Sequence, residues 1–492
     1  MCFLYKNSQD DDCGFQTAKL YVSIDNGNNF NDEKIIQFQS FFNNILYLNP
    51  SQVDSNTLGF FKNMDSNLHF EDFQKNLHKI VSFSTYDPLI NFLLKTNDEN
   101  VHYTVSWIIS VLTENSEDAL IELLNHNILK AIGVNIEYFK FPNSTVLLLN
   151  IIANYLLHQN DLIAQTAHKY FPMVMLLKIF QYLKEKLPIE NDYQYISIEQ
   201  IQLIKSVSNK IFNCIYTTLT KYSNEIRPIE TEILIIEMAG YFDIILKDLK
   251  LCQSLCSIVL FLYDKKWINF NNFKLYNYPS FLCSISKIDN EEVAADSFIL
   301  IGKLISINQY HETNFNDYFK IITNLEENVS PHLLSASLFV CKSFFDNNAV
   351  SNDAYQSLSR NINCLLQLYD RSNFTVKEKV IELLCSYLNH LLHFHVDVIK
   401  QFDSVIISIT NCFFDFVESN DHFDKISPTL HSLFNIIQYL FSIQQINSKS
   451  VIQFISDFHS CIKNLFDSDD DLIRSEAEGF LNSLNTLQNK SN

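Results

Sequence analysis

Residues 97–124 read NDENVHYTVSWIISVLTENSEDALIELL, and this stretch decides the fold. Its apolar stripe recurs at intervals of three and four residues, which is the spacing of one face of an α-helix. The stripe consists of Val101, Val105, Ile108 and Leu112. The polar run TENSED then separates it from a second apolar run, as short connections do between packed helices. The stretch therefore predicts helix packed next to helix, with Trp107 in the middle of the first one.

The same helical spacing continues from Asp32 to about Leu487. The chain has 492 residues but contains 7 glycines and 9 prolines. Because tight turns and phosphate-binding loops depend on glycine, this composition disfavours an α/β enzyme. The sequence contains no GxGxxG, P-loop or GxSxG motif. We therefore expect a nearly all-helical protein that is not an enzyme.

Two independent spacings indicate repeats. With Pro172 set aside, prolines at positions 50, 88, 142, 188, 228, 279 and 331 recur every 38 to 54 residues, and Pro428 follows after 97, about two such steps. Proline is tolerated mainly in the first turn of a helix. Several helices also open with polar residues followed by an aliphatic one, and Val293, Leu333 and Val376 mark this register in steps of 40 and 43. Armadillo and HEAT repeats run at about 40–47 residues. An irregular helical bundle is the alternative.

We accordingly predict an all-α fold, a right-handed superhelix (alpha-solenoid) of about nine to eleven armadillo/HEAT-like repeats. The expected organisation has a polar N-terminal arm at 1–31, a single repeat domain at 32–487 and a short tail at 488–492. Within the repeat domain, we expect sub-blocks at 32–187, 188–280 and 281–487.

Charge and cysteine usage limit the partners. The net charge is −20, which disfavours binding to nucleic acid and leaves two interpretations, basic partners or simple solubility. No apolar run is long enough to span a membrane, and MCFLYKNSQDDD lacks the features of a secretory signal. Most of the eleven cysteines lie in apolar helical stretches, as Cys214, Cys341, Cys385 and Cys412 do, which is typical of reduced thiols. We expect a cytoplasmic or nuclear protein without a membrane partner.

Two groups of residues raise the question of metal binding. His390, His393 and His395 form the densest histidine cluster, and the first two share a helical face. No metallohydrolase motif accompanies them, so a partly exposed helix end is the favoured interpretation. Cys252 and Cys256 lack a second cysteine pair, which favours buried core thiols. We therefore predict neither a metal nor a cofactor.

Two further stretches have simple structural explanations. Residues 468–471, SDDD, precede an apolar helix, and an N-cap with acids at the positive helix end accounts for them. Trp267 lies in the polar and aromatic stretch YDKKWINFNNFKLYNYP. That stretch is interpreted either as an insertion that docks a partner or, preferably, as a loop that covers the adjacent core.

Residues 71–182 resemble armadillo repeats, and most of all those of importin-alpha. The resemblance rests on a closing helix, a polar turn, Val101, and then Trp107 six residues later. The next unit, PNSTVLLLNIIANYLL, follows the same plan with Asn150 in the position of Trp107. The last repeat, DDDLIRSEAEGFL, is similar to a HEAT consensus with an acidic turn and Arg474. The importin-alpha likeness covers about a fifth of the chain.

The resemblance implies a concave groove in which tryptophan flanks basic side chains and asparagine, four residues later, binds the peptide backbone. On this basis the candidate partner-binding residues are Tyr103, Trp107, Ser110, Asn150 and Asn154. In the later units, the two corresponding positions hold Ile299 and Lys303, Phe339 and Ser343, Glu382 and Ser386, and Gly479 and Ser483.

Two functions follow as hypotheses. The first is a non-catalytic adaptor, similar to importin-alpha, that binds an extended basic peptide during nuclear protein import. The alternative is a regulatory or scaffold subunit that binds a folded partner such as a phosphatase or kinase. Val111 stands four residues after Trp107, where the importin-alpha pattern has asparagine, and residues 1–31 are not basic; both features favour the alternative.

Overall fold

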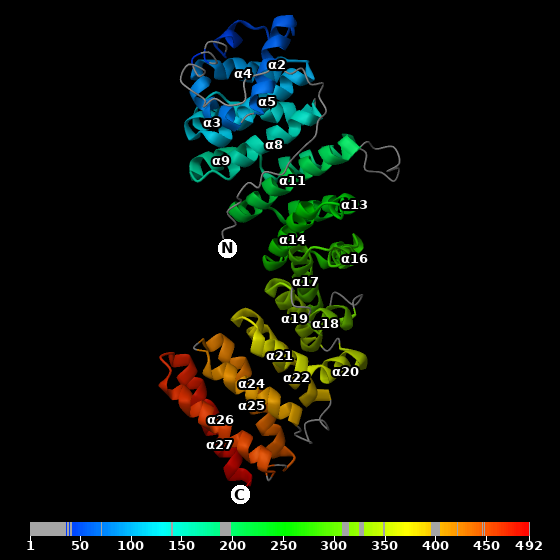
Figure 1. The fold of residues 1–492 in the computed structure, drawn as a ribbon, viewed down its shortest axis with the longest axis vertical. Coiled ribbons are helices and arrows are strands. Elements are labelled where there is room, and N and C mark those ends of the chain that lie inside the picture. The colour runs from blue at the N-terminus through cyan, green and yellow to red at the C-terminus, as the bar shows by residue number, and fades with distance from the viewer. Residues whose placement is uncertain are drawn as a thin grey trace. The chain divides into compact units, whose positions relative to one another are not determined.

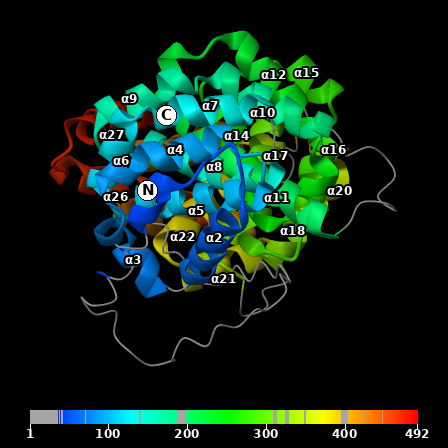
Figure 2. The ribbon, with the colours of Figure 1, turned by 90° about the horizontal axis from the view of Figure 1, so that it is seen from above.

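The structure, a computed structural model, consists of helices wherever it describes regular elements. It describes residues 36, 39, 42–69, 71–138, 141–186, 198–307, 314–323, 329–347, 350–394, 404–420, 422–444, 446 and 448–491. The predicted arm at 1–31 lies outside this part of the chain. Figures 1 and 2 show coiled ribbons and no strand arrow for the described residues.

The chain divides into two compact units, Met1–Ala131 and Ile132–Asn492. In its described residues, the first unit contains two short 3-10 helices and five α-helices before α7 (Ile128–Tyr138) begins at its end. These elements are η1 (Asn44–Tyr47), α2 (Ser55–Leu68), α3 (Glu71–Ile80), η2 (Phe83–Thr85), α4 (Tyr86–Lys95), α5 (Glu99–Asn115) and α6 (Glu117–Asn125).

The second unit continues the series of helices to the end of the described chain. Its first half contains α8 (Pro142–Leu156), α9 (Asp161–Tyr170), α10 (Met173–Lys186), α11 (Ile198–Lys221), η3 (Ser223–Glu225), α12 (Pro228–Ala239), α13 (Phe242–Ile245), α14 (Leu249–Asp264), α15 (Phe270–Leu275) and α16 (Tyr278–Ile285). Its second half contains α17 (Glu291–Ser306), α18 (Phe315–Thr323), α19 (Pro331–Asp346), α20 (Asn352–Arg360), α21 (Ile362–Arg371), α22 (Phe374–Phe394), α24 (Ser404–Glu418), α25 (Phe423–Ser442), α26 (Lys449–Asn464), η4 (Leu465–Asp467) and α27 (Asp471–Ser491).

One long helix recurs in each repeat and packs on the long helix of the next. In the second unit this series runs through α8, α11, α14, α17, α19, α22, α25 and α27, and each contacts the one after it. In the first unit α2 and α5 make the same kind of contact. Helices α17, α19 and α22 begin at residues 291, 331 and 374, in the steps of 40 and 43 read from the sequence. These ten long helices agree with the nine to eleven predicted repeats.

Several of the long helices share one capping device, which explains the register seen in the sequence. Asp98 precedes α5, and its Oδ1 accepts hydrogen bonds from the backbone N–H groups of Asn100 and Val101, both at 3.0 Å. Such a cap satisfies donors that would otherwise lack partners at a helix start. Three later helices have the same cap, in which a side-chain oxygen accepts a hydrogen bond from the backbone N–H three residues later. These bonds join Asn290 to Val293 (3.1 Å), Ser330 to Leu333 (3.3 Å) and Asn373 to Val376 (3.1 Å).

The core lies where the long helices meet each other and the shorter helices. In α5 the predicted stripe of Val101, Val105, Ile108 and Leu112 is fully buried. The contact between α17 and α19 is especially close, because Gly302 leaves no room for a side chain against Phe339. A Cβ atom at position 302 would lie 2.6 Å from Cε1 of Phe339. Glycine at this position therefore lets the two helices approach each other.

Candidate partner-binding surface

Trp107 and Tyr103 are the half-buried side chains in the middle of α5. From Val101 to Thr113, the other side chains of this helix are buried. Since the two aromatic residues are four positions apart, they lie on one face, next to the core stripe. Away from the exposed ends of α5, this face is the part of the helix that a partner can reach.

The indole of Trp107 belongs to a small aromatic cluster. The ring of His69, just after α2, lies 4.8 Å from it at an interplanar angle of 79°, and the ring of Tyr103 lies 5.9 Å away at 62°. Asp65 stands one helical turn before His69. Burial raises the pKa of the Asp65 carboxyl, and the charge of His69 opposes that rise. We name Asp65, His69, Tyr103 and Trp107 the Trp107 cluster.

The other candidate residues are placed differently. Ser110 is 3% exposed and leaves a partner almost no surface to contact. Asn150 and Asn154 are half-buried on α8, in the second unit. The Nζ of Lys210, on α11, donates a hydrogen bond to Oδ1 of Asn150 at 3.0 Å. A groove shared by all five candidates stays a prediction.

In the second unit, several of the positions that correspond to Trp107 and Val111 are used for polar contacts between long helices. Lys303 of α17 forms an ion pair with Asp264 of α14 at 2.5 Å. Ser386 of α22 donates a hydrogen bond to Asp346 of α19, also at 2.5 Å. Ser306 of α17 donates one to Ser343 of α19 at 3.2 Å. Polar contacts between neighbouring repeats thus occupy positions at which the importin-alpha pattern has the peptide-binding tryptophan and asparagine.

The ion pairs among these contacts continue from α14 to α27, and we name them the charge ladder. Each joins one long helix to the next, or two residues of one long helix. Its members are Asp264–Lys303, Asp296–His332, Lys342–Asp346, Lys342–Glu382, Lys379–Glu382, Glu378–Lys425 and His431–Glu476.

The histidine cluster does not assemble a metal site within the described residues, where no group of three or more candidate ligands comes together. His390 is 9% exposed, and its ring packs 5.5 Å from that of Phe345 and 4.8 Å from that of Phe394. His393 is exposed, and His395 lies outside the described residues. His390 and His393 therefore have different surroundings.

The cysteine pair is confirmed as buried core thiols. Cys252 and Cys256 are free and buried. The Sγ of Cys252 donates a hydrogen bond to the carbonyl of Ile245 at 3.0 Å. Burial raises the pKa of the Cys252 thiol to about 12, so the thiolate that binds zinc is disfavoured there.

The acidic run at 468–471 caps α27, as predicted. Oδ1 of Asp470 accepts a hydrogen bond from the N–H of Leu472 at 2.8 Å. Arg474 contacts Asp471 and the carbonyl of Ser468, which further fixes the helix start.

Trp267 lies in the turn between α14 and α15, and its ring packs 6.1 Å from that of Phe261. Much of the surrounding stretch is helical, since α15 and the start of α16 fall within it. This agrees with the interpretation that Trp267 covers the adjacent core.

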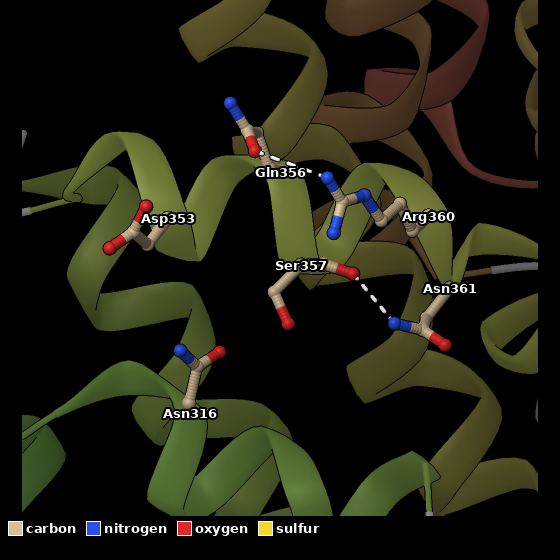
Figure 3. A pocket seen from close by; sticks show the side chains of 6 residues that line it. All are labelled: Asn316, Asp353, Gln356, Ser357, Arg360 and Asn361. Atoms are coloured by element: carbon tan, nitrogen blue, oxygen red, sulfur yellow. Dashed lines mark hydrogen bonds between the residues drawn. The ribbon is translucent and has the colours of Figure 1, made fainter.

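A shallow pocket of about 370 Å³ opens between α18 and α20. Figure 3 shows Asn316 of α18 on one side of the pocket and Asp353, Gln356, Ser357 and Arg360 of α20 on the other, with Ser357 pointing toward Asn316. Its sixth lining residue is Asn361. Small-molecule sites are lined mostly by apolar side chains with a few placed polar groups. All six residues that line this pocket are polar, so the pocket does not resemble such a site.

Sequence reasoning missed Asp65 and His69 and the partners in the charge ladder. For the ladder, a signal was available. Lys303 and Asp264 are separated by 39 residues, and Lys342 and Glu382 by 40 (382 − 342), which is one repeat step. Opposite charges recurring at the repeat period would have indicated pairing between neighbouring long helices. Asp65 and His69 carry only the ordinary i, i+4 spacing of a helix.

The comparisons with known proteins bear on the fold. No protein-family model and no curated protein matches the chain in sequence. A solved structure from work on the phosphorylation switch in the cadherin–beta-catenin interaction matches with a TM-score of 0.53, 11% identity, and coverage of 92% of this chain and 96% of that one. A designed armadillo repeat protein matches at 0.33, with 12% identity and coverage of 49% and 98%. Importin beta matches at 0.40, with 9% identity and coverage of 95% and 63%.

The likeness to the beta-catenin structure shows the fold, and the two lower scores carry no argument of their own. Together with the stacked long helices and their repeat step, it defines the class of the protein. The chain has the armadillo/HEAT-type helical-repeat fold, as predicted. None of the described helices is both long enough and apolar enough to cross a membrane.

Proposed function

We propose that the chain is a non-catalytic protein-binding scaffold that holds an extended basic segment of a partner on its first unit. The observation that supports this is the half-buried Trp107 in the middle of α5, flanked by Tyr103 and His69, where the other side chains from Val101 to Thr113 are buried. An indole face attracts a cation by about 0.5–2 kcal/mol, and tryptophan and tyrosine dominate binding hot spots. The net charge of −20 would attract a basic partner.

The specific form of this proposal is a cargo adaptor similar to importin-alpha, acting in nuclear protein import between cytoplasm and nucleus. It is supported by the sequence resemblance of residues 71–182, with Val101 and Trp107 in register. The Trp107 cluster of the first unit would take the basic side chain, and Asn150 and Asn154 on α8 stay separate candidate residues of the second unit, where they would offer amide groups. An amide that binds a peptide backbone contributes about 0.5–1.5 kcal/mol for each hydrogen bond.

The test is the affinity of the full chain for short unstructured peptides, measured by fluorescence anisotropy. Lysine- and arginine-rich peptides should bind more tightly than neutral or acidic ones of equal length. Trp107→Ala should weaken that binding by about tenfold, the equivalent of ~1.4 kcal/mol. Trp267→Ala, which removes the other tryptophan, is the matched control and should leave the affinity unchanged. A chain without preference for basic peptides, unaltered by Trp107→Ala, would contradict the proposal.

A second candidate function is a regulatory or scaffold subunit that binds a folded domain, such as a phosphatase or kinase. It is favoured by the second unit, where positions equivalent to Trp107 and Val111 hold groups already paired within the chain, such as Glu382 and Lys303. The two functions differ in what they capture. An adaptor would retain peptides from a digested extract, whereas a scaffold for a folded domain would retain only intact proteins.

A further inference from the structure

A basic stretch begins at the turn after α14 and continues through α15 and past α16. Residues 265–288 contain four lysines and neither aspartate nor glutamate, in a chain whose net charge is −20. The side chains of Lys265, Lys266 and Lys274 are exposed, and no ion pair joins them to a carboxylate among the described residues. Their charge is therefore open to a partner.

The backbone at Lys266 would suit glycine better than lysine. Its φ is 59°, in the left-handed region, where a side chain crowds the backbone and glycine avoids that cost. The N–H of Trp267 donates to the carbonyl of Leu262 at 2.9 Å, which is the bond that closes a helix at such a residue. An exposed lysine thus stands where the local backbone favours glycine, and positions of this kind cluster at functional sites.

Helix α15 presents a basic and an apolar side chain outward. Its inner side is fixed by two ring contacts, of Phe270 with a tyrosine of α14 (6.2 Å between centroids) and of Phe273 with a tyrosine of α16 (4.3 Å). Lys274 is exposed, and Leu275 next to it is 74% exposed. A leucine beside lysines suits a partner segment that has both carboxylates and an apolar side chain.

Two carboxylates border this stretch, and both already have partners. Asp264 forms an ion pair with Lys303 at 2.5 Å. Glu232 of α12 accepts hydrogen bonds from the side-chain amides of Asn269 at 3.1 Å and Asn272 at 3.4 Å. With Lys303 counted, the lysines outnumber these two carboxylates, so the surface is positive.

The exposed lysines are close enough together for one short segment. Lys266 and Lys274 are eight residues apart, and with α15 between them they lie within about 20 Å of each other. About six extended residues span that distance. Because the Debye length is about 8 Å at physiological ionic strength, a short segment responds mainly to these lysines. A long polyanion would also meet the acidic remainder of the chain.

We propose that Lys265, Lys266, Lys274 and Leu275, which we name the α15 surface, dock a short acidic segment of a partner protein. Carboxylates of the segment would pair with the lysines, and one apolar side chain would lie on Leu275. The α15 surface lies at a turn and on a short helix, not along the series of long helices. It goes beyond the proposed function, because it uses different residues and selects the opposite charge.

The experiment measures the affinity of the full chain for a glutamate-rich peptide of about eight residues with one central leucine, by fluorescence anisotropy. The comparison peptide has glutamine in place of each glutamate. The acidic peptide should bind about tenfold more tightly, and its affinity should fall as the salt concentration rises. Lys274→Gln and Leu275→Ala should each weaken its binding about two- to fivefold. Equal affinity for the two peptides would overturn the inference.

Lys266→Gly separates binding from folding. It removes a charge and relieves the left-handed backbone, so it should weaken binding of the acidic peptide about two- to fivefold while raising the midpoint of thermal unfolding. If Lys266 served only to complement the negative end of α14, this variant would leave the affinity for the peptide unchanged, and the inference would fail.

Lys463→Gln is the matched control, because Lys463 is exposed in the last turn of α26, as Lys265 is exposed at the end of α14. Equal weakening by Lys463→Gln and Lys274→Gln would show a bulk charge effect and overturn the inference. Single-stranded DNA or anionic lipid vesicles are further probes. If either bound as tightly as the acidic peptide and lost affinity in Lys274→Gln, the surface would be a phosphate site and the inference would be wrong.

The proposed function can fail separately from this inference. Trp107→Ala should weaken the binding of basic peptides and leave the affinity for the acidic peptide unchanged. Loss of acidic-peptide binding in Trp107→Ala would place that peptide on the first unit and contradict the α15 surface.

Discussion

At the scale of single residues, Gly302 sets the distance between two long helices. A Cβ atom there would meet the ring of Phe339 at 2.6 Å, and the contact between α17 and α19 has no space to absorb it without a shift. Phe339 is half-buried, so its ring can move, but only by giving up contacts in the interface. Glycine therefore suits position 302, although alanine is the better helix former by about 1 kcal/mol.

We predict that Gly302→Ala lowers the free energy of unfolding by about 1 kcal/mol, because overpacking outweighs the gain in helix propensity. The measurement is the midpoint of urea unfolding at unchanged m-value. Gly479→Ala is the control, since nothing lies within 4 Å of a Cβ at position 479 in α27. That variant should be stabilised by about 0.5–1 kcal/mol. Equal upward shifts for the two variants would show that the α17–α19 contact is not tight.

At the scale of elements, the helix starts were the most predictable feature. Val293, Leu333 and Val376 could be aligned from sequence because each follows a capping side chain by three residues, and the structure shows the bonds that make this so. What could not be predicted was which side chain of one helix meets which of the next. The ring contact of His69 with Trp107 and the ion pair of Lys342 with Glu382 depend on the separation and rotation of neighbouring helices. Helical periodicity does not specify either of these.

The capping bonds of α5 give a second prediction. Asp98→Ala removes the acceptor for the N–H groups of Asn100 and Val101, and should cost about 1 kcal/mol in stability. Asp98→Asn keeps an oxygen acceptor, so it should lower the stability by only a small part of that ~1 kcal/mol, about a few tenths. Thermal unfolding followed by circular dichroism provides the comparison. If Asn were as destabilising as Ala, loss of the charge rather than of the hydrogen bonds would account for the effect.

The ion pair between α17 and α19 gives a prediction about pH. The side-chain hydrogen bond to the Asp296 carboxylate raises the pKa of the His332 imidazole above its ordinary value of 6.5. Burial lowers this pKa, whereas the negative charges of Asp296 and Glu292 raise it further. Because the folded-state pKa is the higher one, the stabilisation is fully present below 6.5 and is lost as the pH rises through the folded-state pKa. Because the His332 side chain is 52% exposed, solvent screening keeps this contribution to the free energy of unfolding well under about 1 kcal/mol.

Asp296→Asn should therefore lower the pKa of His332, as measured by NMR titration of histidine-labelled full-length protein. Glu292→Gln, on the same helix, removes only the smallest of these contributions and should lower the pKa less. Equal shifts in the two variants would mean that the field of α17, rather than the contact with Asp296, sets the pKa.

At the scale of the whole molecule, the fold could be read from sequence because every repeat carries the same signal. Helical periodicity, polar caps and a step of about 40 to 50 residues recur along the chain, so an error in one repeat does not change the conclusion. The binding surface has no such redundancy. Trp107 occurs in one repeat, and the equivalent positions elsewhere hold Ile299, Phe339, Glu382 and Gly479. The resemblance to one family therefore predicted the architecture more completely than the site.

The cysteines test the packing of many repeats in one experiment. Six free cysteines are buried, namely Cys214, Cys252, Cys256, Cys341, Cys385 and Cys461. Burial raises the pKa of Cys214 to about 12, which leaves about one thiolate in 10⁵ at neutral pH. The thiolate is the nucleophile, so these positions should resist alkylation for both chemical and steric reasons.

Among the nine cysteines that the structure describes, we predict that iodoacetamide modifies half-buried Cys283 and Cys364 first in the native protein, and the six buried ones only on unfolding. Cys412 is also half-buried but should react more slowly, because burial and the nearby carboxylates of Asp415 and Asp370 raise its pKa. Mass spectrometry of digested samples, taken along a time course, gives each rate. Cys341 reports directly on the close α17–α19 contact, since it lies on α19. Gly302→Ala should therefore speed the alkylation of Cys341 and leave the alkylation rate of Cys461, on α26, unchanged. Equal acceleration at both cysteines would instead show that distant repeats open together and not one by one.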